Sequence, residues 1–443
     1  MTMQEFRERA FQSALAQGCE AAETYYAEQE AFEANAQGGE IDRYAVSRTG
    51  GLSLRVKLGG RDGYAYTECL DDPEGLVRRA MDNARAIEEE DAHPMQGACT
   101  YAPVATPSSA LDGVDEAGKL ALALQLERET LAQDARVKRV MYCEVGTAAG
   151  RIAIHNTLGL AAEREQRMGY AYVMPVMQQG EELQNALAFR TGREAADTAA
   201  CAAEAVRETL DRFGGEPVPT GTYGVILRGD AMADLLAAFS PMFSAEEAQK
   251  GRSLLTGREG ETIGAPCVTL VDDPFHPYAP RAFDGEGTPC RRKQLVEAGR
   301  LVTLLHNLKT ARKAGCESTG NALRASAASP VGVGPTVLYL QPGEQGRDAL
   351  LRQMGDGLFI TSLEGLHAGV DPISGDFSLK ACGRRVQGGA LGGAVSQITV
   401  AGNFLTLLQA VAAVGDDPRF GLPGSVCVGA PSVLVRELMV AGA

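Results

Sequence analysis

Histidine and closely spaced cysteine are scarce in this sequence, and their scarcity excludes several common sites. Only five histidines occur, and no two lie within about twenty residues, so the paired histidines of an H-E-x-x-H zinc helix are absent. The ten cysteines contain no C-x-x-C pair, which predicts reduced thiols rather than a zinc knuckle or a disulfide framework. The P-loop, the glycine-rich dinucleotide motif, the nucleophile elbow and S-x-x-K are also missing.

Positive charge is also limited. The chain has 42 Lys and Arg against 57 Asp and Glu, a formal net charge of −15, which argues against direct binding of nucleic acid. The first twenty residues carry charges and no apolar segment, so we expect no signal peptide and a cytoplasmic location. The uncharged run 386–415 is long enough to span a bilayer. Its glycines divide it into a strand-like AVSQITV and a helix capped by Asn403 and stopped by Gly415, so we expect no membrane contact.

Glycine and acidic residues are abundant, and they are unevenly distributed. Residues 1–213 hold 35 acids and 22 bases (net −13), whereas 214–443 hold 22 acids and 20 bases (net −2). Of the 52 glycines, 34 lie in the second part. The junction GGEPVPTGT suits neither a helix nor a central strand. We therefore predict two domains, 1–213 and 222–443.

Hydrophobic periodicity predicts an α+β protein. The first part has the pattern of a helix-and-antiparallel-strand domain, and the second that of a glycine-rich, mainly β domain. A helix, strands and a helix occur in this order twice in the first part, which suggests an internal duplication. In the first part we expect an opening helix with apolar residues at 6, 10, 14 and 15 that is stopped by Gly18, and further helices near 73–87, 115–134 and 194–213. We expect strands there at 52–58, 64–68, 137–145, 151–155 and 160–178. In the second we expect strands at 222–227, 267–273, 336–342, 357–363 and 394–400, and helices at 230–239, 346–355 and 403–414.

Two polar segments of the second part are candidate sites. Asp272, Asp273, Asp284 and Glu286 form an acidic group that suits Ca²⁺ or Mg²⁺. The same acids also suit turns and ion pairs with the basic run 291–293.

The second segment is GLHAGVDPISGDFSL, 365–379, a polar loop that contains His367, Asp371 and Asp376. Two of these residues also have a structural interpretation: His367 would form a structural hydrogen bond, and Asp376 would cap a turn. Cys316, Cys382 and Cys427 are interpreted as small packed residues, although Arg384 and Arg385 lie near Cys382.

Several long motifs in a fixed order resemble one known family. They are GLHAGVDPISGDFSLKACG (365–383), ITVAGN (398–403), FDGEGTPCRRKQLVEAGRL (283–301), TARKAGCESTGNALR (310–324), GAPSVLVRELMVAG (429–442) and, more loosely, 53–87. On these motifs the chain resembles the TldD/PmbA family, formerly called modulators of DNA gyrase and also known as peptidase U62.

This resemblance implies an intracellular zinc metallopeptidase built from two related subunits. A TldD-type subunit carries zinc on an H-E-x-x-x-H helix together with a distant cysteine, and a PmbA-type (TldE-type) subunit lacks the metal. Here the helix after GTYGVIL reads DAMADLLAAFSPMF, without histidine, and VCVGAPS around Cys427 does not match the family's metal cysteine. The resemblance therefore favours the PmbA type. It implies no catalytic or metal residue and no cofactor in this chain, with zinc in the partner.

Three functional hypotheses follow. The first is a non-catalytic subunit that pairs with a TldD-like metallopeptidase, or with itself, and channels unfolded peptides. Exposed strand edges of the glycine-rich domain would bind them, and His367, Asp371 and Asp376 would line the channel. The second is a stand-alone metal-dependent hydrolase that uses Asp272, Asp273, Asp284 and Glu286. The third is a protein-binding modulator of DNA gyrase, without direct DNA contact.

Overall fold

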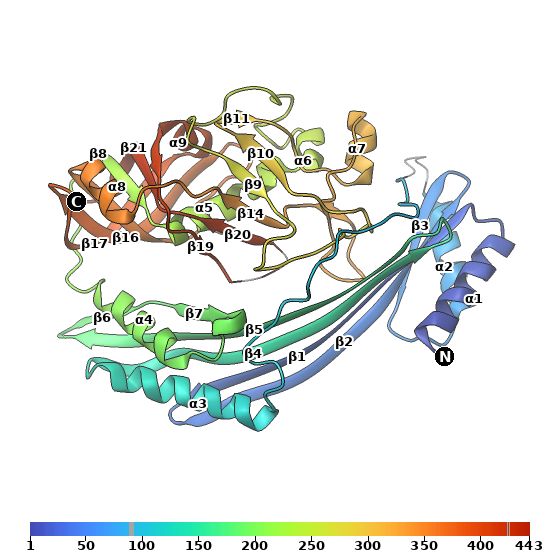
Figure 1. The fold of residues 1–443 in the computed structure, drawn as a ribbon, viewed down its shortest axis with the longest axis horizontal. Helices are drawn as coiled ribbons and strands as arrows, with labels where there is room; N and C mark the ends of the chain where they lie inside the picture. The colour runs from blue at the N-terminus through green and yellow to red at the C-terminus, as the bar shows by residue number, and fades with distance from the viewer. Residues whose placement is uncertain (88–92, 423, 425) are drawn as a thin grey trace.

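The computed structural model describes residues 1–87, 93–422, 424 and 426–443, and it confirms the α+β fold class. A long curved sheet with helices forms the first half, and a β-rich half lies over it (Figure 1). The elements of the first half are α1 Met3–Ala16, β1 Ala21–Gln37, β2 Glu40–Leu58, β3 Arg61–Thr67, α2 Pro73–Ala86, α3 Glu116–Gln133, β4 Val137–Asn156, β5 Ala161–Gln179, β6 Glu182–Asn185, β7 Ala188–Thr191 and α4 Thr198–Leu210.

The sheet of the first half has the strand order β3-β2-β1-β4-β5-β6, with β7 also paired to β5. Helices α1 and α2 cover one end of it and α3 and α4 the other (Figure 1). At the first end Leu52, Leu54 and Val56 alternate along β2 and pack on Phe6 of α1 and on α2, as the sequence LSLRVKL predicts. The helix–strands–helix order occurs twice, and the first strands of the two sets, β1 and β4, pair antiparallel at the centre of the sheet.

Two predictions for this sheet were wrong. The strand expected at 52–58 already begins at Glu40. The segments 137–145 and 151–155 are not separate strands, because β4 runs without a break from Val137 to Asn156. The small residues Gly146–Gly150 between them pair with β1 on one side and with β5 on the other, and this double ladder keeps them extended.

The second half contains two six-stranded sheets. One has the order β17-β16-β15-β8-β21-β18, and an additional pairing of β17 with β21 closes it into a barrel. The other has the order β11-β10-β9-β14-β20-β19. The elements are β8 Gly221–Leu227, α5 Gly229–Phe239, α6 Ala245–Gln249, β9 Leu270–Asp272, β10 Lys293–Glu297, β11 Arg300–Leu301, α7 Leu308–Ala314, β12 Ala322–Leu323, β13 Gly332–Val333, β14 Val337–Leu340, α8 Arg347–Met354, β15 Gly357–Glu364, β16 Asp376–Gln387, β17 Ala390–Asn403, α9 Phe404–Ala410, β18 Val411–Val414, β19 Arg419–Phe420, β20 Cys427–Ala430 and β21 Val433–Ala441; short 3₁₀ turns occur at Gly192–Glu194 and Ser240–Phe243.

Closure of the barrel uses part of the strand edges of the glycine-rich half. Residues 399–401 of β17 pair with 439–441 of β21, and the terminal strands of the second sheet, β11 and β19, have two residues each, so peptide binding at the edges of this half stays a prediction. Among the described residues, the longest strand edge without a partner lies in the first half. Residues 52–58 of β2 pair with β3, whereas Glu40–Gly51 pair with β1 and with no other strand that the structure describes.

The uncharged run 386–415 folds as a strand and then a helix, as predicted. Asn403 caps α9, accepting hydrogen bonds from the Leu405 and Thr406 amides. The predicted stop at Gly415 was wrong, because α9 ends at Ala410 and the chain continues as β18, which pairs with β21. Within the described ranges no helix is long and apolar enough to cross a membrane.

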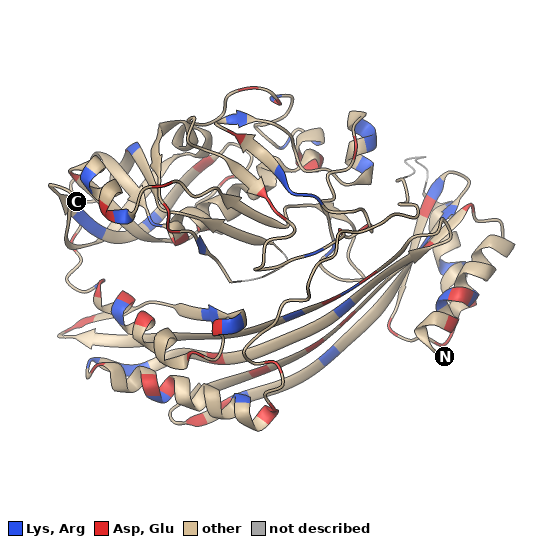
Figure 2. Ribbon diagram, viewed as in Figure 1, with Lys and Arg blue, Asp and Glu red and all other residues tan. Residues whose placement is uncertain are grey.

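All ten cysteines are free, as the sequence predicts. Cys382 and Cys427 are buried, whereas Cys316 is exposed, so the prediction that all three are packed inside holds only for the first two. Charges of both signs are scattered over the helices and over the middle of the long sheet (Figure 2).

Candidate functional site

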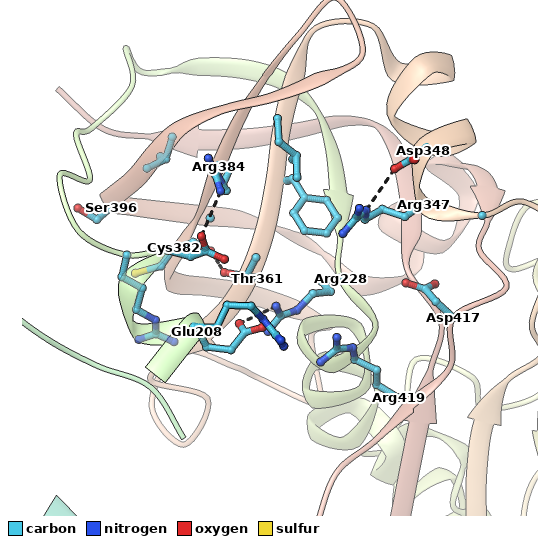
Figure 3. Close-up of a pocket in the computed structure, with 18 of the residues that line it drawn as sticks. Glu208, Arg228, Arg347, Asp348, Thr361, Cys382, Arg384, Ser396, Asp417 and Arg419 are labelled. Atoms are coloured by element: carbon cyan, nitrogen blue, oxygen red, sulfur yellow. Dashed lines mark hydrogen bonds and ion pairs between the residues drawn. The ribbon is translucent and has the colours of Figure 1, made fainter. Parts of the chain in front are cut away.

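A cavity of about 800 Å³ lies between the end of α4 and the barrel, where it is bordered by α8, β15, β16 and β17 (Figure 3). Seven arginines and four acids line it, so the lining has an excess of three positive charges. The arginines are Arg207, Arg212, Arg228, Arg347, Arg352, Arg384 and Arg419, and the acids are Glu208, Asp211, Asp348 and Asp417.

Arg228 lies at the N-cap of α5 and links the two halves. Its Nε and Nη2 donate to the two carboxylate oxygens of Asp230 at 2.7 and 2.6 Å, and its Nη1 donates to Glu208 Oε2 on α4 at 2.7 Å. Burial by itself lowers the pKa of Arg228, but the hydrogen bonds and charges of Asp230 and Glu208 raise it overall. The guanidinium therefore stays charged and is held in place on two sides.

Other arginines of the cavity differ in how firmly they are held. Arg384 donates to the Gly392 carbonyl at 2.9 and 2.7 Å and to Asp211 at 3.2 Å. By contrast, Arg207 and Arg352 have no ion pair or side-chain hydrogen bond with any residue that the structure describes. These two guanidiniums remain available to an anionic ligand.

The cavity lining has the chemistry of a binding site rather than of a nucleophilic one. It holds no histidine. Its cysteine, Cys382, is buried, and burial raises the pKa of the thiol, which disfavours the nucleophilic thiolate. Ser396 donates its hydroxyl to the Gly215 carbonyl at 2.8 Å, so it has no adjacent base. The arginines suit carboxylate or phosphate groups, which guanidinium binds through two parallel hydrogen bonds.

The residues near α5 do not fit a zinc ion. This helix follows the GTYGVIL strand, carries neither histidine nor cysteine, and has Asp230 already engaged by Arg228. Cys427 is buried, and burial raises the pKa of its thiol, which opposes the deprotonation that a metal ligand requires. Among the residues described, no group of three or more His, Cys, Asp or Glu is arranged to hold a metal ion.

The acids proposed as a cation site are not assembled into one. Asp272 is fully buried, and its carboxylate accepts from Lys293 Nζ at 2.9 Å, from Asn321 Nδ2 at 2.7 Å and from the amide and hydroxyl of Thr336 at 2.6 and 2.7 Å. The neighbouring Asp273 lies 3.4 Å from Arg292 Nε. Ion pairing with the basic run 291–293 is therefore confirmed for these two acids.

Asp284 and Glu286 are also used internally. Asp284 accepts from the amides of Glu286, Thr288 and Ala322, each at 2.9 Å. Glu286 accepts from the Leu308 amide at 2.9 Å and contacts His93 Nε2 with its other oxygen. The metal-binding hypothesis for these acids was wrong, because amides and cations already occupy the oxygens that an ion needs.

The loop 365–379 is held by its own turn. Asp371 Oδ1 accepts from the Ile373 amide at 2.9 Å, which lowers the pKa of Asp371, and Asp376 accepts from Asn403 Nδ2 at 3.0 Å. His367 is exposed. None of the three predicted channel residues lines the arginine-rich cavity, so their role in lining a channel stays a prediction.

Sequence patterns alone hardly indicate this cavity. Its arginines come from α4, α8, β16, β19 and two loops, between positions 207 and 419, and no motif contains them. The adjacent pair Arg384 and Arg385 was the one local signal, and only Arg384 lines the cavity.

Three family models match the chain in sequence order. They describe the PmbA/TldA metallopeptidase domain 1 (residues 22–84), central domain (110–213) and C-terminal domain (220–442). A metalloprotease of Methanothermobacter thermautotrophicus is 32% identical over 237 residues, which cover 51% of this chain and about half (52%) of that protein. The metalloprotease PmbA of Escherichia coli O157:H7 is 25% identical over 419 residues, which cover 91% and 88% of the two chains.

Solved structures share the whole fold. A Thermotoga maritima protein, crystallised as a candidate modulator of a DNA gyrase, has a TM-score of 0.91 and 33% identity, with 99% of this chain and 100% of that chain covered. TldE of Thermococcus kodakarensis has a TM-score of 0.89 and 21% identity over 99% and 100% of the two chains, a likeness of fold. Because the C-terminal family model matches half of the sequence and the other two match most of the rest, the chain belongs to the PmbA/TldD metallopeptidase family.

Proposed function

We propose that this chain is the TldE-type, non-catalytic subunit of a TldD-type zinc metallopeptidase that acts on unfolded peptides. The observation that carries the proposal is the start of α5. In this region a TldD-type chain is expected to have its metal-binding histidines, whereas this chain has an Arg228–Asp230 ion pair. In the partner, zinc would polarise the peptide carbonyl and activate water. This chain would supply binding surface.

The arginine-lined cavity is the proposed contribution to substrate binding. Its excess positive charge attracts carboxylates at a peptide C-terminus or on acidic side chains, in a protein whose net charge is −15. Arg207 and Arg352, which have no ion-pair partner among the described residues, are the groups that would bind them. Arg228, held by Asp230 and Glu208, would keep the wall of the cavity rigid.

We also propose that the unpaired edge of β2 is where the catalytic subunit docks. Glu40–Gly51 offer backbone groups on one side that no neighbouring strand uses. Tyr44 and Val46 on this edge are 56% and 52% exposed. The free backbone groups of a long strand edge with apolar side chains can pair with a strand of another chain, which would cover the edge.

Co-expression with an H-E-x-x-x-H relative from the same source tests the pairing. We expect the two chains to co-purify in a fixed ratio, with zinc bound in proportion to the relative. Recovery of this chain with gyrase, and without that relative, would instead support the modulator hypothesis, for which the name of the Thermotoga maritima neighbour is the main support.

A further inference from the structure

A second group of arginines lies outside the cavity, where the long sheet meets the second half. Arg164 on β5, Arg281 after β9 and Arg324 after β12 surround the packed side chains of Tyr25 and Phe283. The Nε atom of each of the three arginines is buried and has no hydrogen-bond partner. Over the described ranges, none of them forms an ion pair with a carboxylate.

Aromatic rings set the orientation of two of these guanidiniums. Arg324 Cζ lies 4.5 Å from the centroid of the Tyr25 ring, and Arg164 Cζ lies 5.6 Å from that of Phe283. Tyr25 and Phe283 belong to the same buried cluster, and Arg281 precedes Phe283 by two residues. Contacts with ring faces leave the N–H groups at the guanidinium edges free to donate.

The positive charge of this group is not neutralised locally. Burial, followed by the charge of Arg281, lowers the pKa of Arg164 to about 10. Two acids whose charges act on this group have hydrogen bonds of their own: Asp284 accepts three backbone amides, and Glu23 accepts from Asn156 at 3.1 Å. Like charges held together in a partly buried place destabilise the fold unless a counter-ion joins them.

We propose that Arg164, Arg281 and Arg324 form a binding site for an oxyanion, a carboxylate or a phosphate group. The three guanidiniums approach from three separate segments and present fork-shaped donors, the geometry that such anions accept in pairs of hydrogen bonds. None of the three residues lines the arginine-rich cavity, so the site is a separate one. It lies between the two halves and requires no second subunit.

Calorimetric titration of the purified full chain tests this site with two probes at constant ionic strength. One is inorganic phosphate, and the other is a short N-acetylated peptide with a free C-terminal carboxylate, compared with its amidated form. The variants are the double substitution Arg164→Gln with Arg324→Gln, and Arg281→Gln alone, which disturbs no aromatic contact that the structure records. The matched control is Arg167→Gln. Arg167 is an exposed residue of β5, the strand that carries Arg164, and its Nη2 lies 3.6 Å from Glu165 Oε2.

We expect the natural chain and Arg167→Gln to show, for at least one probe, a saturable binding event that is about tenfold weaker or lost in both site variants. Peptide binding at the arginine-lined cavity would persist in those variants. The probe that binds identifies the source of the anion, and the amidated peptide would lose binding if the carboxylate is that source. Without ligand, Arg281→Gln should unfold at the same or a higher temperature, because it removes a like charge. Absence of saturable binding by both probes, or unchanged binding in both variants, would overturn the proposal.

Discussion

Asp272 shows how single buried residues hold the second half together. Its carboxylate joins β9 to Lys293 on β10, to Asn321 and to Thr336, so donors from three segments meet on one fully buried group. Lys293 has 9% of its side chain exposed and depends on this carboxylate for its counter-charge. The sequence indicated the pairing of acids with the run 291–293. It did not indicate the hydrogen bonds of Asn321 and Thr336, which lie 49 and 64 residues after Asp272 in the chain.

Asp272→Ala should destabilise the fold strongly. Removing one partner leaves Lys293 as a largely buried charge without compensation, a loss that costs about 3–5 kcal/mol. Urea unfolding followed by circular dichroism measures it. The adjacent Asp273→Ala is the control, because Arg292 is half exposed and the loss should be about 1 kcal/mol. Equal effects of the two substitutions would contradict this account of the network.

Asp284 predicts a pH dependence of stability. Burial and the charge of Glu286 raise its pKa to about 7, against an ordinary value of 3.8. The folded chain therefore binds a proton here that the unfolded chain has already released. The stabilising contribution is complete below pH 3.8 and is lost as the pH rises through about 7.

Substituting Asp284→Asn should flatten this slope. The variant loses the acceptor for the Ala322 amide and should be less stable at all pH values, but its unfolding free energy should fall less than that of the natural chain between pH 5 and pH 8. Urea titrations at both pH values give the comparison. A variant with the same slope as the natural chain would mean that another group titrates in this range.

At the scale of elements, local patterns predicted most helices and strands, and long-range pairing decided the rest. Asn403 was recognisable as the cap of α9, because Asn before an apolar helical run is a local signal. Two other features could not be recognised from local sequence: β4 runs without a break, and β18 replaces the end of the expected helix. Both depend on pairing with strands from distant segments. The free edge of β2 also depends on tertiary structure, because β3 pairs with residues 52–58 alone.

Val46→Lys should weaken association with the catalytic subunit that we propose as the partner. A lysine on the free edge of β2 opposes pairing with another strand, while the folded chain should lose no more than about 0.5 kcal/mol because the position is on the surface. Ile373→Lys is the matched control, since Val46 and Ile373 are both 52% exposed. Analytical ultracentrifugation of each variant mixed with the partner measures the affinity. Equal affinities for the two variants would place the partner on another surface.

For the molecule as a whole, the sequence was sufficient for the family and the α+β class, because long motifs and hydrophobic periods are local properties. It was insufficient for the sites. Arginines between positions 207 and 419 line the cavity, and Arg164, Arg281 and Arg324 meet around Tyr25 only because the long sheet lies against the second half. No spacing rule in the sequence links such distant positions, because they come together only when the barrel closes and the two halves pack against each other.

We propose that this chain contributes binding surface and that catalysis belongs to a zinc-bearing partner. The most direct test measures hydrolysis of an unfolded peptide, together with bound zinc, for three samples: this chain alone, the H-E-x-x-x-H relative alone, and the two combined. We predict no hydrolysis and no stoichiometric zinc for this chain alone, and the highest rate for the combination. Zinc-dependent hydrolysis by this chain alone, at a rate that the relative does not increase, would contradict the claim.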